Sequence, residues 1–178
     1  MKGKLKPDFS EAITLIQNSF AMIPDDEKLS PNEFKSIEKS IDELKADRIR
    51  IFYSYKNAKR FLNGDILYKL QARPIISPAA GAALFSIKSP EWFIGMSDSF
   101  IKNTRNIDAK IRGRILQAIA NIMKAPIKKK GNTVKPLVGE KKGLWRYRFG
   151  DFRIIYHPDI STKLVLLLAF DSRGSVYA

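Results

Sequence analysis

Residues 144–156 constrain the fold of this chain most, because their pattern predicts a β-hairpin with a defined register. Two runs that alternate arginine with aromatic and aliphatic residues flank Gly150-Asp151, and a two-residue connection of this kind favours a tight hairpin turn. In that hairpin residue 149 pairs with 152, 148 with 153 and 146 with 155. Successive side chains of a strand point to opposite faces, so Arg146, Arg148 and Arg153 project from the same side.

The two faces of this hairpin differ in chemistry. One face carries six side chains suited to a core, namely Trp145, Tyr147, Phe149, Phe152, Ile154 and Tyr156. The other face places Arg148 directly opposite Arg153, and like charges opposed across strands destabilise a sheet. A bound anion would relieve this repulsion. A solvated cationic face is the simpler alternative, but ordinary surfaces mix both signs of charge, and residues 144–149 contain no carboxylate.

The charge of the chain also favours an anionic partner. The 178 residues have a formal net charge of +14, and the excess is uneven. Residues 1–89 contain 15 Lys and Arg against 11 Asp and Glu, whereas residues 90–178 contain 17 against 7. Such a surface attracts a phosphate-rich partner from a distance, so we expect the function to lie in the C-terminal half.

The composition excludes several kinds of site. The chain has no cysteine and one histidine, which rules out disulfides, thiolate chemistry and the usual zinc sites, and we expect no metal and no cofactor. No apolar run reaches the roughly 18 residues of a membrane span. Residues 1–7 also lack the apolar region of a signal peptide. We therefore expect a cytoplasmic protein with no membrane partner.

The first 89 residues predict a mainly helical segment. Residues 8–23 have helical periodicity, with Asp8 and Glu11 at capping-box spacing, and Pro24 ends the helix. The acidic residues 25–27 that follow are interpreted as a charged turn between helices.

A second helix begins with an N-cap, a proline at the first position and a reciprocal glutamate, in residues 30–33. Its apolar stripe continues to Asn63-Gly64, which favours one long helix that packs against a partner or forms a homodimer with a second copy. Two shorter helices separated near Asp47 are the alternative. Residues 65–73 then alternate like a strand, and 74–81 resemble a connector.

The expected organisation is a helical extension, residues 1–89, followed by a second domain, residues 90–178. The second domain predicts a strand, two helices and three or four further strands, over residues 91–96, 97–105, 107–124, 134–138, 144–149, 152–156 and 164–170. The resulting fold class is α+β, with two helices packed on a small, mainly antiparallel, twisted sheet.

This order, with the arginine hairpin, the leucine-rich strand at 164–170 and the terminal Arg173-Gly-Ser-Val-Tyr177, resembles the RelE/ParE toxin superfamily. The resemblance covers residues 90–178 and implies a toxin of a type II toxin–antitoxin system. RelE-like members cleave mRNA in the ribosomal A site, whereas ParE-like members inhibit DNA gyrase on the same scaffold. The implied partners are mRNA, the ribosome and a cognate antitoxin. Residues 1–89 lie outside the resemblance.

For the RelE-like activity, the resemblance implies a catalytic set of Arg146, Arg148, Arg153, Arg173 and Tyr177. The RNA 2′-hydroxyl would attack the adjacent phosphorus, Arg148 and Arg153 would neutralise the phosphorane, Arg173 would lie near the leaving 5′-oxygen, and Tyr177 would stack on a base or orient the nucleophile. RelE-like nucleases often have lysines at the first two positions. A guanidinium does not release its proton near neutral pH, so the identity of the general base stays open.

Three functions remain as alternatives: a ribosome-dependent endoribonuclease, a gyrase inhibitor, and a nucleic-acid-binding module without catalysis. We favour the first because of the concentration of cations. The only histidine, His157, precedes a proline at the predicted end of a strand, so we expect it to be an exposed loop residue rather than an acid–base catalyst. The N-terminal segment has three possible roles: contact with an antitoxin, self-association, or an inhibitory arm over the toxin site, the last of which the acidic run Asp25-Asp26-Glu27 would permit.

Overall fold

The computed structural model describes residues 8–52, 54–65, 92–138 and 143–172. A six-stranded sheet in the order β1-β2-β6-β5-β4-β3 forms its centre. The strands are β1 (Ile49–Phe52), β2 (Phe93–Ser97), β3 (Val134–Pro136), β4 (Trp145–Phe149), β5 (Phe152–Asp159) and β6 (Leu164–Ser172). Neighbours are antiparallel except β2 and β6, which are parallel. The α+β class expected from the sequence is confirmed.

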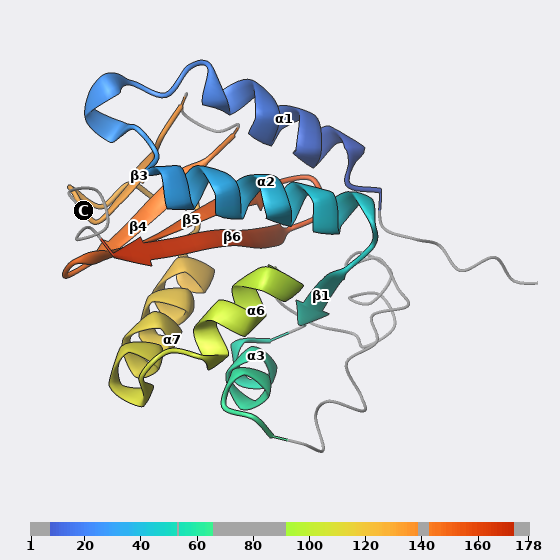
Figure 1. The fold of residues 1–178 in the computed structure, drawn as a ribbon, viewed down its shortest axis with the longest axis vertical. Helices are drawn as coiled ribbons and strands as arrows, with labels where there is room; N and C mark the ends of the chain where they lie inside the picture. Colours follow the sequence, from blue (N-terminus) through green and yellow to red (C-terminus); the bar gives the residue numbers. More distant parts are fainter. Residues whose placement is uncertain (1–7, 53, 66–91, 139–142, 173–178) are drawn as a thin grey trace, which may run out of the picture.

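Helices cover both faces of the sheet, as Figure 1 shows. On one face lie α3 (Tyr55–Leu62), α6 (Asp98–Arg105) and α7 (Ala109–Lys124). The Ser97 hydroxyl caps α6 by accepting from the amide of Phe100, and Asp108 caps α7. The isoleucine stripe of α7 packs on the sheet, as predicted, with Ile115 and Ile119 fully buried.

The opposite face is covered by α1 (Ser10–Phe20) and α2 (Pro31–Lys45), joined through the short 3-10 helix η1 (Asp25–Glu27). The predicted capping box at the start of α2 is present: the Ser30 hydroxyl accepts from the Glu33 amide, and the Glu33 carboxylate accepts from the Ser30 amide. The apolar stripe of α2 packs on the chain's own sheet, where Ile37, Ile41 and Leu44 are at most 3% exposed.

The prediction of one long helix from residue 30 to 62 is wrong. Helix α2 ends at Lys45, and Asp47 adopts a left-handed φ of 59°, which an α-helix does not tolerate. The chain then forms β1, which pairs with β2, before α3 begins. The alternative with a break near Asp47 is the one observed. The predicted strand at 65–73 lies almost wholly outside the described residues.

The predicted hairpin register is confirmed. Residues 149 and 152, 148 and 153, and 146 and 155 are paired, and Gly150 has the positive φ of 59° that the turn requires. The core face of the hairpin is also as predicted: Trp145, Tyr147, Ile154 and Tyr156 join the core under α6 and α7. The arginine face therefore lies on the side of α1 and α2.

Among the described residues, no helix is long and apolar enough to cross a membrane.

Candidate functional site

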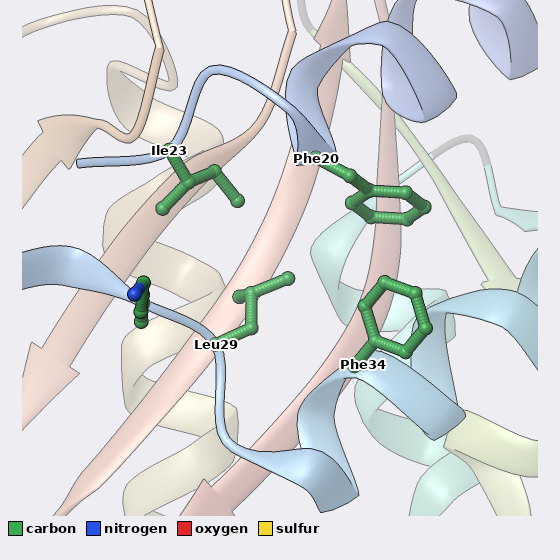
Figure 2. Close-up of a pocket in the computed structure, with 5 residues that line it drawn as sticks. Phe20, Ile23, Leu29 and Phe34 are labelled. Carbon is green, nitrogen blue, oxygen red and sulfur yellow. The ribbon is translucent and has the colours of Figure 1, made fainter. Parts of the chain in front are cut away.

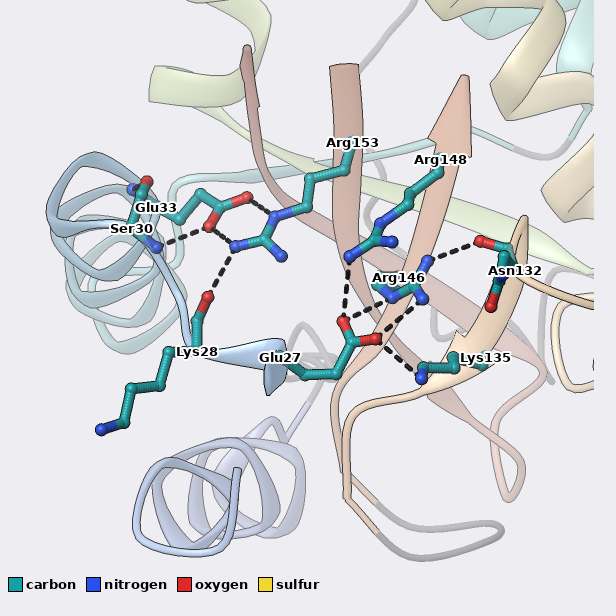
Figure 3. Close-up of polar contacts among 9 residues, drawn as sticks. All are labelled: Glu27, Lys28, Ser30, Glu33, Asn132, Lys135, Arg146, Arg148 and Arg153. Carbon is teal, nitrogen blue, oxygen red and sulfur yellow. Dashed lines mark hydrogen bonds and ion pairs between the residues drawn. The ribbon is translucent and has the colours of Figure 1, made fainter. Parts of the chain in front are cut away.

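The arginine face of the hairpin is covered by the segment that connects α1 to α2. Arg146 is 0% exposed and Arg153 is 9% exposed, while Arg148 is partly exposed. The expectation of an open cationic surface is wrong for this conformation, because residues 27–33 place two carboxylates directly over the guanidinium groups (Figure 3).

Glu27 is the centre of the first group of contacts. Its Oε1 accepts from Arg146 Nη2 at 2.8 Å and lies 2.7 Å from Lys135 Nζ. Its Oε2 lies 2.7 Å from Arg146 Nε and 3.3 Å from Arg148 Nη2. Arg146 also donates to the carbonyl oxygen of Asn132 at 2.7 Å. One carboxylate thus receives three cations from β3 and β4, which is the arrangement expected around a bound anion.

Glu33 forms the second group of contacts with Arg153. The Arg153 guanidinium donates through Nε and Nη2 to the two carboxylate oxygens of Glu33, and Nη2 also donates to the Lys28 carbonyl at 2.9 Å. Next to this pair, the Ser30 hydroxyl donates to the Asp171 carboxylate at 2.8 Å. The start of α2 is therefore attached to β5 and β6 by hydrogen-bonded ion pairs and polar contacts.

The electrostatic environment keeps Glu27 ionised. Burial alone would raise the pKa of its carboxyl, but the hydrogen bonds of Arg146 and Lys135 and the charges of Arg146 and Arg148 together lower the pKa below its ordinary value of 4.5. The interpretation of residues 25–27 as a solvated charged turn is therefore wrong for Glu27, which is 5% exposed. It holds for Asp25, which forms an exposed ion pair with Lys28.

Sequence reasoning identified the three arginines but missed Lys135, which joins them in what is called here the arginine cluster (Lys135, Arg146, Arg148 and Arg153), and the two glutamates that cover this cluster, Glu27 and Glu33. Lys135 pairs with Arg146 in the register of β3 and β4. Pairing the predicted strand 134–138 with the hairpin would therefore have placed Lys135 beside the arginines. The acidic run 25–27 did suggest an inhibitory arm over the site, but a charged turn was preferred, and Glu33 was assigned only to the capping box; both glutamates lie about 120 positions from their partners in the chain. Arg173 and Tyr177, the remaining expected catalytic residues, lie outside the described residues.

His157 is not the exposed loop residue that was expected. Strand β5 continues to Asp159, and His157 is 2% exposed. Its Nδ1 lies 2.8 Å from the Gly143 carbonyl oxygen, and because a carbonyl only accepts, Nδ1 carries the hydrogen. Burial lowers the pKa of the imidazole, although the Gly143 hydrogen bond and the charges of Asp159 and Glu11 act in the opposite direction. Pro158 is tolerated in the strand because it lies beyond the last β4 pair, Trp145 with Tyr156.

The part of the chain that the structure describes contains no cluster of histidine and carboxylate groups that could hold a metal ion. A pocket lined by Phe20, Ile23, Lys28, Leu29 and Phe34 lies at the junction of α1 and α2 (Figure 2). All of its lining belongs to residues 20–34, so the pocket is a feature of the connecting segment and not of the arginine cluster.

One family model matches the C-terminal part of the chain. Residues 94–177 match the family model described as the ParE toxin of the type II toxin–antitoxin system parDE. This part of the chain is therefore similar to the ParE toxin family. The match begins inside β2, so the first 93 residues, including α1, α2 and β1, lie outside it. No curated protein sequence matches the chain.

Several solved structures are similar to a little under half of the chain. The RelBE2 toxin–antitoxin complex of Mycobacterium tuberculosis has 21% sequence identity and a TM-score of 0.38, over 48% of this chain and 100% of that chain. The archaeal RelE–RelB complex of Pyrococcus horikoshii has 23% identity and a TM-score of 0.39, over 44% of this chain and 91% of the other. The intact RelBE complex of E. coli has 11% identity and a TM-score of 0.35, over 46% and 95%.

Proposed function

We propose that the toxin domain is a ribosome-dependent endoribonuclease that inhibits translation by cleaving mRNA in the A site. One observation carries the proposal: Lys135, Arg146 and Arg148 converge on a single carboxylate, with Arg153 on the neighbouring strand. A carboxylate that bridges several cations occupies the position that an RNA phosphate would take. We further propose a cognate antitoxin as a protein partner.

The proposed mechanism uses the nucleophile that RNA itself carries. The cluster holds the scissile phosphate so that the 2′-hydroxyl is in line with the phosphorus, and this positioning supplies much of the rate. Arg148 and Arg153 then stabilise the negative charge that develops on the phosphorane oxygens. Arg173 stabilises the negative charge on the leaving 5′-oxygen, which takes its proton from water, and Tyr177 stacks on a base or orients the nucleophile. The products carry a 2′,3′-cyclic phosphate and a 5′-hydroxyl.

Lys135 gives the cluster a group that the arginines do not provide. A lysine ammonium releases a proton far more readily than a guanidinium does. The Nζ of Lys135 lies 2.7 Å from Oε1 of Glu27, the carboxylate that occupies the proposed phosphate position. We therefore include Lys135, in its neutral amine form, as the candidate base that accepts the 2′-hydroxyl proton while the 2′-oxygen attacks phosphorus. Its substitution by arginine keeps the charge and removes this capacity, so it separates binding from proton transfer.

The test uses translating ribosomes and maps mRNA 5′ ends by primer extension. Because Glu27 and Glu33 occupy the cluster, the full-length chain is assayed beside a Glu27→Gln/Glu33→Gln variant in which both carboxylates are neutral. We expect cuts within the A-site codon, which disappear when Arg153→Ala/Arg173→Ala is added. Intact mRNA, from a variant shown to be folded, overturns the ribonuclease proposal.

A matched control removes two cations away from the cluster. Lys110 and Lys124 lie on α7 and are exposed, so Lys110→Ala/Lys124→Ala changes the net charge by the same amount as the arginine variant. Cleavage that persists in this control and disappears in Arg153→Ala/Arg173→Ala depends on the cluster and not on overall charge.

Inhibition of DNA gyrase is the second candidate function. It is favoured by the family model itself, which describes ParE toxins, and by the ion pairs that occupy Arg146 and Arg153 in this conformation. A supercoiling assay with purified gyrase tests it directly. Loss of supercoiling together with intact mRNA would support this function over the ribonuclease.

A further inference from the structure

We infer that residues 21–33, here named the strap, form an inhibitory segment that covers the arginine cluster. The phosphate backbone of a nucleic acid displaces the strap when it binds to this cluster. The strap connects α1 to the first turn of α2 and crosses the arginine face of the hairpin (Figure 3). This inference rests on the proposed function only in taking RNA as the displacing anion.

The strap is attached mainly by charge. Three of its side chains are buried, and all three are polar: Glu27, Ser30 and Glu33 are between 1% and 5% exposed. Each of them contacts the face of the sheet that carries the arginines, through Arg146, Asp171 and Arg153 respectively. A competing anion can therefore weaken most of this attachment by taking over the arginine partners.

The apolar side chains of the strap contribute much less to its attachment. Met22 is 65% exposed, and Ile23 and Leu29 are only partly buried. Ile23 and Leu29 pack against the edge of the core and line the pocket with Phe34, which is 38% exposed, so packing in this region is incomplete (Figure 2). Loosely packed segments with few buried apolar contacts open at a lower free energy than the core around them.

The rest of α2 is anchored independently of the strap. Ser40 donates to the Leu168 carbonyl at 2.8 Å and contacts the Ser97 hydroxyl, and the Glu43 carboxylate accepts from the amide and hydroxyl of Ser99. The stripe of Ile37, Ile41 and Leu44 is buried against the sheet. The strap can therefore open while α2 beyond its first turns keeps its place and the sheet stays covered.

The chemistry of the contacts identifies the competitor. Glu27 and Glu33 present carboxylates to a lysine and three arginines, in bidentate and bridging geometries that a backbone phosphodiester can reproduce with its two non-bridging oxygens and single negative charge. Nucleic acid offers many such groups in a row and releases counterions when it binds cations. Binding of the strap and binding of RNA to this cluster exclude each other.

The test measures binding without cleavage. A short 2′-O-methyl RNA cannot provide the 2′-hydroxyl nucleophile, so its affinity for the full-length chain, measured by fluorescence anisotropy, reports access to the cluster alone. We expect Glu27→Gln/Glu33→Gln to bind this RNA at least about tenfold more tightly than the wild type, with a steeper salt dependence.

The control variant has the same change of net charge as the strap variant, with both substitutions on α2. Glu38 and Asp42 are exposed residues of α2, so Glu38→Gln/Asp42→Asn removes two carboxylates that do not cover the cluster. We expect this control to bind RNA nearly as the wild type does. Equal affinity of the strap variant and this control would overturn the inference.

Hydrogen exchange in the unmodified chain provides a second measurement that does not depend on the folding of any variant. Added 2′-O-methyl RNA should raise the exchange of amides in residues 21–33 and leave those of residues 37–45 protected. Unchanged or slower exchange in the strap at saturating RNA refutes displacement. If the strap opens and RNA binds but no mRNA is cut on ribosomes, the inference stands and the ribonuclease proposal fails.

Discussion

Neutralising Glu27 should destabilise the protein more than removing its principal partner, Arg146. In Glu27→Gln, the Arg146 guanidinium, which is 0% exposed, loses the anion beside its Nε and Nη2. Removing one partner of a buried ion pair costs about 3–5 kcal/mol. Lys135 and Arg148 are partly exposed and reach water, so each adds less than about 1 kcal/mol.

Removal of Arg146, the other partner of the ion pair, has a different consequence. In Arg146→Met, the Glu27 carboxylate keeps Lys135 at 2.7 Å and Arg148 at 3.3 Å, so no unpaired charge is buried. The methionine also fills much of the space of the arginine stem. The main loss is then the hydrogen bond to the Asn132 carbonyl, about 1 kcal/mol. We expect Glu27→Gln to cost at least about 2 kcal/mol more than Arg146→Met.

Opening of the strap sets an upper limit on the loss of unfolding free energy in Glu27→Gln. If releasing residues 21–33 costs less free energy than burying an unpaired guanidinium, the Glu27→Gln protein opens instead, and the measured loss equals the free energy of strap closure. Urea unfolding followed by tryptophan fluorescence measures the global term, because Trp92 and Trp145 lie in the core on the other face of the sheet. Hydrogen exchange of the strap measures the local term.

The matched control is Glu38→Gln, which makes the same chemical change at an exposed position of α2 and should stay within about 0.5 kcal/mol of the wild type. A Glu27→Gln protein with wild-type stability and wild-type exchange in the strap would refute the reasoning. So would an Arg146→Met protein that is less stable than Glu27→Gln, because it would mean that the carboxylate depends on Arg146 alone.

Three further outcomes are expected. Glu33→Gln removes the charge that pairs with Arg153 but retains a capping-box acceptor, so Glu33→Ala should be less stable than Glu33→Gln by about 1 kcal/mol in urea unfolding. The pKa of Glu27 is lower in the folded state, so its contribution to stability is present above pH 4.5 and is lost as the pH falls through the lowered value. Hydrogen exchange of the strap should therefore depend less on pH over this range in Glu27→Gln than in the wild type. The pKa of His157 is also lowered by burial, so its neutral form stabilises the fold above pH 6.5 and this contribution is lost below that value; proton NMR of the only imidazole in the chain should show a titration midpoint below 6.5.

The parts of the fold that were predictable depend on local rules. The register of the hairpin follows from the turn at Gly150 and from the alternation of its strands, and the start of α2 follows from the capping box at residues 30–33. The break at Asp47 was harder to predict, because Ile51 continues the helical stripe of α2 although it lies in the four-residue strand β1. So short a strand is fixed by its pairing with β2, which the local sequence does not reveal.

The covering of the arginine face could not be predicted for a similar reason. The opposition of Arg148 and Arg153 correctly indicated that an anion compensates them, but no local pattern distinguishes a carboxylate 120 positions earlier in the chain from an external phosphate. His157 was misjudged because a proline after a strand residue usually ends the strand, whereas here Pro158 lies where β4 no longer pairs. In each case a contact between distant segments overrides the local signal.

If RNA displaces the strap as inferred, the strap sets the affinity of residues 94–177 for RNA as well as the access of RNA to the arginines. When only a fraction of molecules has the cluster open, the apparent dissociation constant equals the intrinsic one divided by that fraction. Each 1.4 kcal/mol by which Glu27 and Glu33 stabilise the closed strap therefore weakens RNA binding about tenfold. The same two carboxylates thus stabilise the fold and restrain the proposed activity. Substitutions that loosen the strap should lower stability and raise RNA affinity together, with a slope close to one when both are expressed as free energies.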